Sequence, residues 1–165
     1  QNSFDSQVVG LRYFNVYGPC EEHKGTMAST VFHFHNQILE NGSCNLFKGI
    51  EGYKNGEQRR DFIHVDDCAS VNLWFMKNKK FSGIFNVGTG NSYTFNALAE
   101  SVLKWHKLRR NLDAKIEYIE FPNHLRGSYQ SFTQANIEKL RKIGYKKKFL
   151  NIHDGVFKYL DKISN

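Results

Sequence analysis

The chain has 165 residues, of which 40% are hydrophobic and 15% aromatic, and only two are proline. This composition excludes a disordered or low-complexity protein and predicts about one folded domain. No apolar run approaches the ~18 residues that a membrane helix needs, so we expect no membrane partner. The net charge of +7 favours anionic ligands, but it does not choose among nucleic acid, lipid and small phosphorylated molecules.

The cysteines argue against a disulfide framework and against a zinc site. There are three of them, Cys20, Cys44 and Cys68, and no C-x-x-C spacing occurs. An odd number of widely spaced thiols indicates a reducing compartment, and we therefore expect a cytoplasmic protein with no bound metal.

The first half of the chain alternates apolar runs with turn residues and helical spacings. Strands are predicted where β-branched and aromatic residues run together, and a helix where apolar residues recur every three or four positions. The expected elements are a buried strand (8–16), a helix (29–39), a short strand (45–48) and a glycine-rich loop (49–58).

The second half continues this alternation, which favours an α/β organisation over a helix bundle or a β-sandwich. Asp66 or Asp67 is the expected N-cap of a helix that follows a strand, while Thr94 and Asn151 are expected to cap two later helices. The expected strands are 61–65, 83–87 and 115–121, and one further helix is expected over 133–144.

Three segments carry most of the functional information. They are Asn15-Val16-Tyr17-Gly18-Pro19, Arg60-Asp61-Phe62-Ile63-His64-Val65-Asp66-Asp67 and Phe85-Asn86-Val87-Gly88-Thr89-Gly90. In this order and separation they resemble the C-terminal half of extended short-chain dehydrogenases/reductases that act on nucleotide sugars. The resemblance implies an α/β fold in which the last strands of a Rossmann-type sheet accompany a small mixed α/β substrate-binding domain.

Further segments narrow the resemblance. They are Glu22-His23-Lys24-Gly25, Met27-Ala28-Ser29 and Tyr129-Gln130-Ser131-Phe132-Thr133-Gln134-Ala135. Over essentially the whole chain, the sequence is similar to the family of ADP-L-glycero-D-manno-heptose 6-epimerases. That similarity implies inversion at C6 of an ADP-heptose by hydride removal and return with NADP, NAD being possible. It also implies a role in supplying heptose for the lipopolysaccharide inner core, and a homo-oligomer, which in that family is a pentamer.

Inversion at one carbon needs two acid/base groups, because the hydroxyl lies on opposite faces before and after the reaction. In the family, one is the tyrosine of a Y-x-x-x-K helix and the other is the lysine of the H-K-G segment. The second maps to Lys24, which would border the nicotinamide together with Val16.

The resemblance also assigns substrate contacts. Asn15 and Thr26 would bond sugar hydroxyls, His33 would face the ligand, and Tyr129 would close over it. Arg60 would clamp the diphosphate, a task that suits a planar and permanently charged guanidinium, with Arg59 as the alternative. The nucleotide-contact segment maps to Phe47, Lys48, Gly49 and Ile50.

The sequence also departs from the family pattern. Cys20 stands where the family has arginine, and the loop over 51–58 is longer than expected. The chain contains neither a G-x-x-G-x-x-G turn nor a Y-x-x-x-K helix, so we expect most of the cofactor site to lie in an absent N-terminal half. Residues 1–165 would then be a substrate-binding portion interleaved with the last strands of the NADP-binding domain, inactive alone.

Three other hypotheses remain open. The first is that the chain is a non-catalytic remnant of such an enzyme, and the second is that it is part of another NAD-dependent nucleotide-sugar epimerase or dehydratase. The third is that it is a basic nucleic-acid-binding module. The last requires aromatic and basic residues interleaved on one exposed face, whereas most aromatic residues here occupy inward positions of predicted strands and helices. We therefore expect no nucleic-acid partner, and we expect the loops between Gly18 and Arg60 to form one pocket that holds both Lys24 and His33.

Overall fold

The computed structural model describes residues 6–164. Its strands are β1 (Val9–Tyr13), β2 (Asn15–Tyr17), β3 (Ser43–Phe47), β4 (Arg59–Arg60), β5 (Phe62–His64), β6 (Gly83–Val87), β7 (Tyr93–Thr94) and β8 (Lys115–Ile119). Its helices are η1 (Glu22–Met27), α1 (Thr30–Asn41), α2 (Val65–Lys77), α3 (Phe95–Arg110), η2 (Asn123–Leu125), α4 (Glu138–Lys142) and α5 (Ile152–Ile163), where η marks a 3-10 helix.

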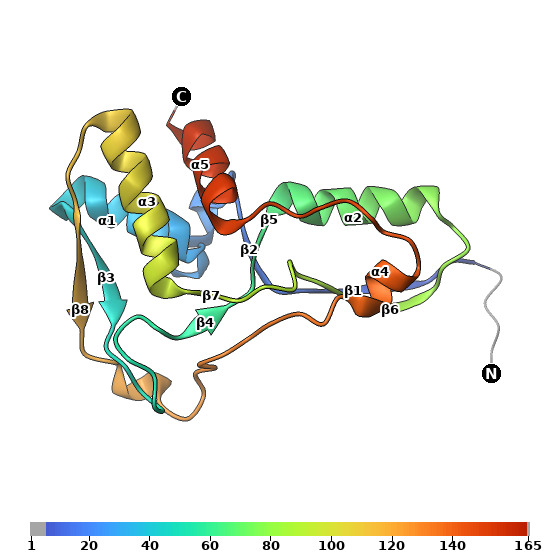
Figure 1. The fold of residues 1–165 in the computed structure, drawn as a ribbon, viewed down its shortest axis with the longest axis horizontal. Helices are drawn as coiled ribbons and strands as arrows, with labels where there is room; N and C mark the ends of the chain where they lie inside the picture. The colour runs from blue at the N-terminus through green and yellow to red at the C-terminus, as the bar shows by residue number, and fades with distance from the viewer. Residues whose placement is uncertain (1–5, 165) are drawn as a thin grey trace.

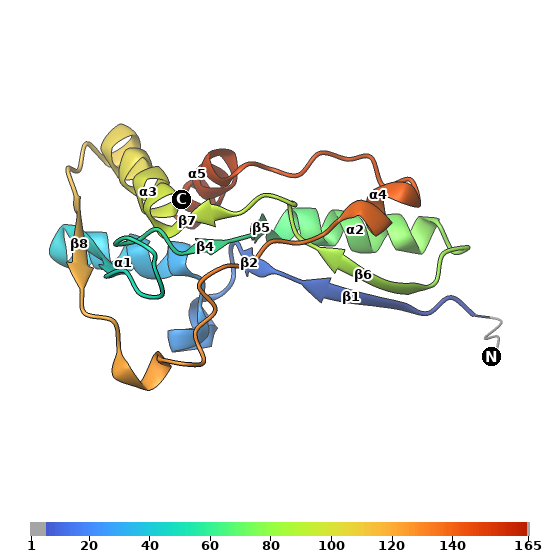
Figure 2. The same ribbon diagram turned by 60° about the horizontal axis from the view of Figure 1, so that its bottom comes forward.

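The molecule is elongated, with one group of elements at each end (Figures 1 and 2). Helices α1, α3 and α5 lie with β3 and β8 at one end, and α2 and α4 lie with β1 and β6 at the other. The pairs β1–β6, β2–β5 and β3–β8 are parallel, whereas β4–β7 is antiparallel. The predicted α/β class, with parallel strand pairs joined by helices, is confirmed.

The two ends have separate hydrophobic cores, and the β2–β5 pair lies between them. Successive side chains of a strand point to opposite faces, so neighbouring residues reach different cores. Tyr17 and Phe62 pack in the core of α1, α3 and α5, whereas Ile63 packs in the core of α2 and β6. The short pair β2–β5 therefore fixes the position of one group of elements relative to the other.

Three predicted helix starts are confirmed. The side chains of Ser29, Thr94 and Asn151 each accept a hydrogen bond from a backbone N–H in the first turn of α1, α3 and α5. Helix α1 ends at Gly42 in the left-handed conformation, which glycine adopts without steric cost. The strands over 45–48, 61–65, 83–87 and 115–121 and the loop over 49–58 are also present, with ends that differ by one or two residues.

The prediction of one continuous buried strand over 8–16 is wrong. The run forms two strands, β1 and β2, separated at Phe14, whose N–H donates to the carbonyl of Val87. Val8 and Tyr13, at the two ends of this stretch, are 55% and 46% exposed, so the run is not buried along its length. Apolar content therefore predicted strand conformation correctly and burial incorrectly.

The predicted cap of α2 is also wrong. His64 is the N-cap, because its Nδ1 accepts the N–H of Asp66 at 3.1 Å. Asp66 and Asp67 lie in the first turn instead, where negative charge still favours the helix dipole.

The helix predicted over 133–144 is restricted to α4, Glu138–Lys142. The preceding residues are extended because their N–H groups bond other segments: Thr133 donates to the carbonyl of Arg59 and Ala135 to Asp61. These tertiary hydrogen bonds replace the helical ones. None of the helices within residues 6–164 combines the length and the apolar character that a membrane crossing requires.

Candidate functional site

The site is assembled around Asp61, a carboxylate with no exposed surface. Its Oδ1 accepts the N–H and the hydroxyl of Thr89, both at 2.7 Å, and its Oδ2 accepts the N–H groups of Gly90 and Ala135 at 2.9 and 3.1 Å. A Cβ on Gly88 would lie 2.7 Å from Oδ2, so only glycine permits this approach. Asp61 thus joins the turn after β6 and the segment before α4 to β5, beside Arg60.

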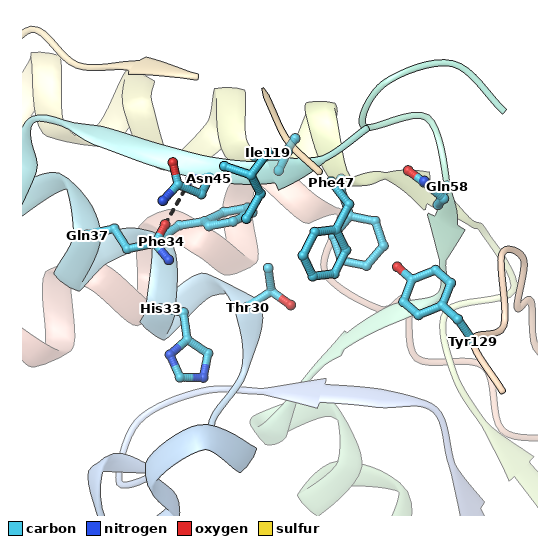
Figure 3. Close-up of a pocket in the computed structure, with 11 residues that line it drawn as sticks. Thr30, His33, Phe34, Gln37, Asn45, Phe47, Gln58, Ile119 and Tyr129 are labelled. Carbon is cyan, nitrogen blue, oxygen red and sulfur yellow. Dashed lines mark hydrogen bonds between the residues drawn. The ribbon is translucent and has the colours of Figure 1, made fainter. Parts of the chain in front are cut away.

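A cavity of about 340 Å³, here called the aromatic cavity, opens between α1, β3 and the segment before Ser131 (Figure 3). Its lining residues are Thr30, His33, Phe34, Gln37, Asn45, Leu46, Phe47, Gln58, Phe95, Ile119 and Tyr129. Three residues predicted from the sequence, His33, Phe47 and Tyr129, therefore lie around one hollow. An apolar hollow with a few convergent polar groups is the usual form of a small-molecule site.

Arg60 lies beside this cavity as a buried cation, 7% exposed. Its guanidinium carbon is 4.9 Å from the centre of the Tyr129 ring and 5.9 Å from that of Phe95. No carboxylate of residues 6–164 forms an ion pair with it, and burial lowers its pKa. A buried charge is stable only when it is paired, so the position of Arg60 favours an anionic ligand.

Arg59, the alternative residue for binding the diphosphate, forms hydrogen bonds with Ser92 instead. Its Nε donates to the hydroxyl of Ser92 at 3.1 Å and its Nη2 to the carbonyl of Ser92 at 2.6 Å. These bonds join β4 to the segment before β7 and use two of the guanidinium's donor groups. The geometry therefore favours Arg60 over Arg59 as the arginine available to a ligand.

A second cavity, of about 300 Å³ and here called the lysine cavity, lies at β2 and η1. Asn15, Val16 and Lys24, all predicted from the sequence, line it together with Glu21 and Thr30. The Nζ of Lys24 lies 3.9 Å from Oε2 of Glu21, and the Lys24 side chain is 47% exposed. The carboxyl ends of parallel strands are the usual place for ligands in open α/β sheets.

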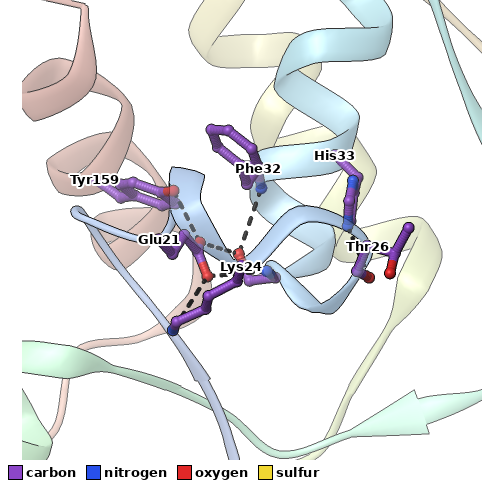
Figure 4. A network of polar contacts seen from close by, with 7 residues as sticks. Glu21, Lys24, Thr26, Phe32, His33 and Tyr159 are labelled. Carbon is purple, nitrogen blue, oxygen red and sulfur yellow. Dashed lines mark hydrogen bonds and ion pairs between the residues drawn. The ribbon is translucent and has the colours of Figure 1, made fainter.

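Lys24 and His33 do not share one pocket, which corrects the expectation of a single hollow. Lys24 lines the lysine cavity and His33 the aromatic cavity, and Thr30 lines both, so the two cavities adjoin. The His33 Nε2 lies 3.3 Å from the carbonyl oxygen of Thr26, in the segment that carries Lys24 (Figure 4).

Besides Arg60, which lies next to the aromatic cavity, four predicted contact residues line neither cavity. Thr26 is exposed, and Lys48 forms an ion pair with Glu120. Gly49 and Ile50 lie in the following turn, where a Cβ on Gly49 would be 1.9 Å from the carbonyl oxygen of Tyr53. Of the predicted nucleotide-contact segment, only Phe47 faces a cavity.

The sequence reasoning missed several polar lining residues. Gln37 on α1 accepts the N–H of Asn45 at 2.8 Å, and Gln58, 1% exposed, donates to the carbonyl of Lys48 at 3.2 Å. A sequence pattern could have identified the lining residues of α1, because their spacing places them on one face of a helix. They are Thr30, His33, Phe34 and Gln37. No sequence pattern marked Gln58.

The residues present fit one end of a dinucleotide cofactor. The lysine cavity lies at the end of β2, with Val16 and Lys24 at its wall, which suits a nicotinamide ring. A glycine-rich phosphate turn does not occur in the sequence, so these residues do not provide for the pyrophosphate. Within residues 6–164, His, Cys, Asp and Glu side chains do not gather in groups of three or more that could hold a metal ion.

Comparison with known proteins places this geometry in a family. The model of the NAD dependent epimerase/dehydratase family matches residues 1–88. The chain belongs to this family. The ADP-L-glycero-D-manno-heptose-6-epimerase of Alkalilimnicola ehrlichii is 50% identical over 164 residues, which are 99% of this chain and 50% of that protein.

Solved structures of this family have the same fold. The Helicobacter pylori ADP-L-glycero-D-manno-heptose-6-epimerase superposes with a TM-score of 0.76 at 32% identity, over 98% of this chain and 46% of that one. A UDP-N-acetylglucosamine 4-epimerase from Methanobrevibacter ruminantium, solved with UDP-N-acetylmuramic acid, gives a TM-score of 0.73 at 29% identity, over 94% and 46% of the two chains. The chain thus spans about half the length of the relatives it matches.

Proposed function

We propose that the chain forms the substrate-binding part of an enzyme that epimerises ADP-D-glycero-β-D-manno-heptose to ADP-L-glycero-β-D-manno-heptose at C6. The observation that carries the proposal is Arg60, a buried guanidinium without a carboxylate partner in the described residues, beside an aromatic cavity that adjoins the lysine cavity. The 50% identity to an epimerase of this name supports the heptose as the sugar.

The cavities suggest an arrangement of the substrate. Phe47, Phe95 and Tyr129 offer aromatic faces to a purine base in the aromatic cavity. The Arg60 guanidinium lies over Tyr129, where its planar fork would bind the diphosphate with charge-assisted hydrogen bonds. The sugar would then extend past Thr30 into the lysine cavity, towards Asn15 and Lys24.

Lys24 would act as one of two acid/base groups at C6. A nicotinamide cofactor, when bound beside Val16 and Lys24, supplies reversible hydride acceptance at this carbon. On its face of C6, the Lys24 amine would take the proton of the hydroxyl in one direction of the reaction, and the ammonium would donate that proton in the reverse direction; the second acid/base group would serve the opposite face. Asn15 would hold a sugar hydroxyl and so fix the orientation of the carbon.

Other parts of the proposal concern the whole protein. We propose NADP as the cofactor, with NAD as the alternative, a homo-oligomeric assembly, and a cytoplasmic role in supplying heptose for lipopolysaccharide. Spectroscopy of the cofactor released from the purified complete gene product, and its mass by light scattering, test the first two.

The decisive experiment replaces the acid/base group. In the complete gene product, Lys24→Met is expected to lower the rate of ADP-heptose epimerisation by about 10²–10⁴-fold, because one face of C6 loses its proton donor and acceptor. The measurement is turnover followed by NMR of the C6 proton, together with circular dichroism to verify folding.

The matched control is Lys54→Met, which removes an exposed lysine of the loop before β4. Its turnover is expected to equal that of the unmodified protein. Equal activity of the folded Lys24→Met variant would contradict the proposed role, and absence of turnover in the unmodified complete gene product would contradict the proposed function.

A further inference from the structure

Glu21 is a buried carboxylate in the segment that carries Lys24, and it is 2% exposed. It accepts three hydrogen bonds: from the Tyr159 hydroxyl to Oε1 at 2.8 Å, from the Ser29 hydroxyl to Oε1 at 2.5 Å and from the Ser29 N–H to Oε2 at 2.9 Å (Figure 4). The Lys24 ammonium lies on the same side of the carboxylate as Oε2, at 3.9 Å.

These contacts fix the carboxylate from two directions. Tyr159 belongs to α5 and has no exposed surface, while Ser29 is the N-cap of α1. The N-terminus of α1 also favours a negative charge, because its N–H groups form the positive end of the helix dipole. Glu21 is therefore held rigidly, whereas the Lys24 side chain is 47% exposed and has four rotatable bonds.

The other titratable groups near this cluster include members of the same segment, Tyr159 of α5 and Tyr17 of β2, which lines the lysine cavity and packs against Tyr159. Burial first, and the hydrogen bond to Glu21 second, raise the pKa of Tyr159, so its hydroxyl remains a donor at all physiological pH values. Glu22 and Cys20 act on Tyr159 in the same direction. Lys24 is the cation that the structure pairs with the Glu21 charge.

We propose that Glu21 is a positioning residue, which holds the ammonium of Lys24 at the wall of the lysine cavity from a carboxylate anchored by Tyr159 and Ser29. This inference rests on the acid/base role proposed for Lys24. Glu21 itself touches neither of the reacting atoms. It limits the positions of a flexible side chain of opposite charge.

The first test is Glu21→Gln in the complete gene product, which removes the charge and keeps the size. The kcat for ADP-heptose is expected to fall about ten- to hundredfold because the amine is less well placed, while KM changes less than about twofold.

Glu22→Gln is the matched control, because it removes the same charge from an exposed neighbour in the same segment. Its kcat and KM are expected to equal those of the unmodified protein. A kcat of Glu21→Gln equal to that of Glu22→Gln would overturn the inference.

A second readout is independent of turnover. Reductive methylation with ¹³C-formaldehyde labels the lysine amines, and the Lys24 signal is identified by its loss in Lys24→Arg. Its ¹³C chemical shift is expected to change in Glu21→Gln and to stay unchanged in Glu22→Gln, because Glu21 is the carboxylate that lies 3.9 Å from the ammonium. An unchanged chemical shift in Glu21→Gln contradicts the Glu21 inference alone, whereas a changed chemical shift in a protein that does not epimerise ADP-heptose supports the inference and contradicts the proposed function.

If Glu21→Gln does not fold, two milder variants carry the test. Tyr159→Phe removes one anchor and leaves the charge, and Glu21→Asp shortens the side chain so that it cannot reach Tyr159 and Lys24 together. Each is expected to lower kcat about fivefold, the effect of one hydrogen bond. Unchanged kcat in both variants would overturn the inference.

Discussion

Two adjacent arginines, Arg59 and Arg60, have different contacts although they are one position apart in the chain. Arg59 and Arg60 are neighbours in β4, and in a strand their side chains point to opposite faces. Arg59 therefore reaches Ser92, whereas Arg60 turns towards Tyr129 and the aromatic cavity. Both carry the same charge, but only Arg60 is buried without a carboxylate partner in the described residues.

This difference predicts a ranking of binding defects. Arg60→Ala is expected to weaken ADP-sugar binding by about 2–3 kcal/mol, since a charge-assisted bond to the diphosphate is lost, and Arg59→Ala by less than about 1 kcal/mol. Isothermal titration calorimetry of the complete gene product with ADP-heptose measures both values. The reverse ranking would assign the diphosphate to Arg59.

At the scale of elements, hydrogen bonds between segments replace regular secondary structure around Asp61. The turn after β6 and the extended residues before α4 both donate backbone N–H groups to this one carboxylate. Because this carboxylate is fully buried and accepts four hydrogen bonds, the positions of these segments depend on a charge that no helix or sheet pattern requires. This is why the helix predicted from residue 133 begins only at Glu138.

Asp61→Asn is expected to lower the free energy of unfolding by about 2–4 kcal/mol, because an NH₂ group would face two buried N–H donors. Urea unfolding followed by circular dichroism measures this change. Asp113→Asn is the control: it removes an exposed carboxylate paired with Lys107, and its expected cost is below about 1 kcal/mol. Equal costs for the two variants would show that the Asp61 bonds are not essential to the fold.

At the scale of the whole molecule, buried histidines make the fold sensitive to acid. His35 on α1 and His106 on α3 are 5% and 0% exposed, and their Nδ1 and Nε2 atoms lie 3.1 Å apart. Burial first, and then the neighbouring His35, lower the pKa of His106 to about 4; burial also lowers the pKa values of His35 and His64. These three buried histidines pack against Tyr17 and Trp105 of the core of α1, α3 and α5, and burial disfavours their charged form in the folded state.

The sign of the pH dependence follows from these lowered pKa values. In the unfolded chain a histidine binds a proton near pH 6.5, whereas folded His106 binds one only near pH 4. The stabilisation is therefore complete above about pH 6.5 and is lost as the pH falls towards 4, by about 2–3 kcal/mol for His106.

Urea unfolding of the complete gene product between pH 7.5 and 4.5 tests this expectation. His106→Gln is expected to flatten the decline in the free energy of unfolding over this window, while His153→Gln, which removes an exposed histidine, is expected to leave it unchanged. A decline that is equally steep in all three proteins would assign the acid sensitivity to other groups.

The sequence by itself determined the α/β class and the side-chain caps of α3 and α5, because these depend on local spacing and turn chemistry, which neighbouring residues in the chain express directly. The candidate site residues Lys24, His33 and Tyr129 came from the resemblance to the epimerase family. Only the tertiary structure distinguished Arg59, bonded to Ser92, from Arg60, buried beside the aromatic cavity, divided the expected pocket into two cavities that meet at Thr30, and placed Glu21 beside Lys24. These outcomes depend on contacts between segments up to 138 residues apart, such as Tyr159 with Glu21, whose partners no local pattern specifies.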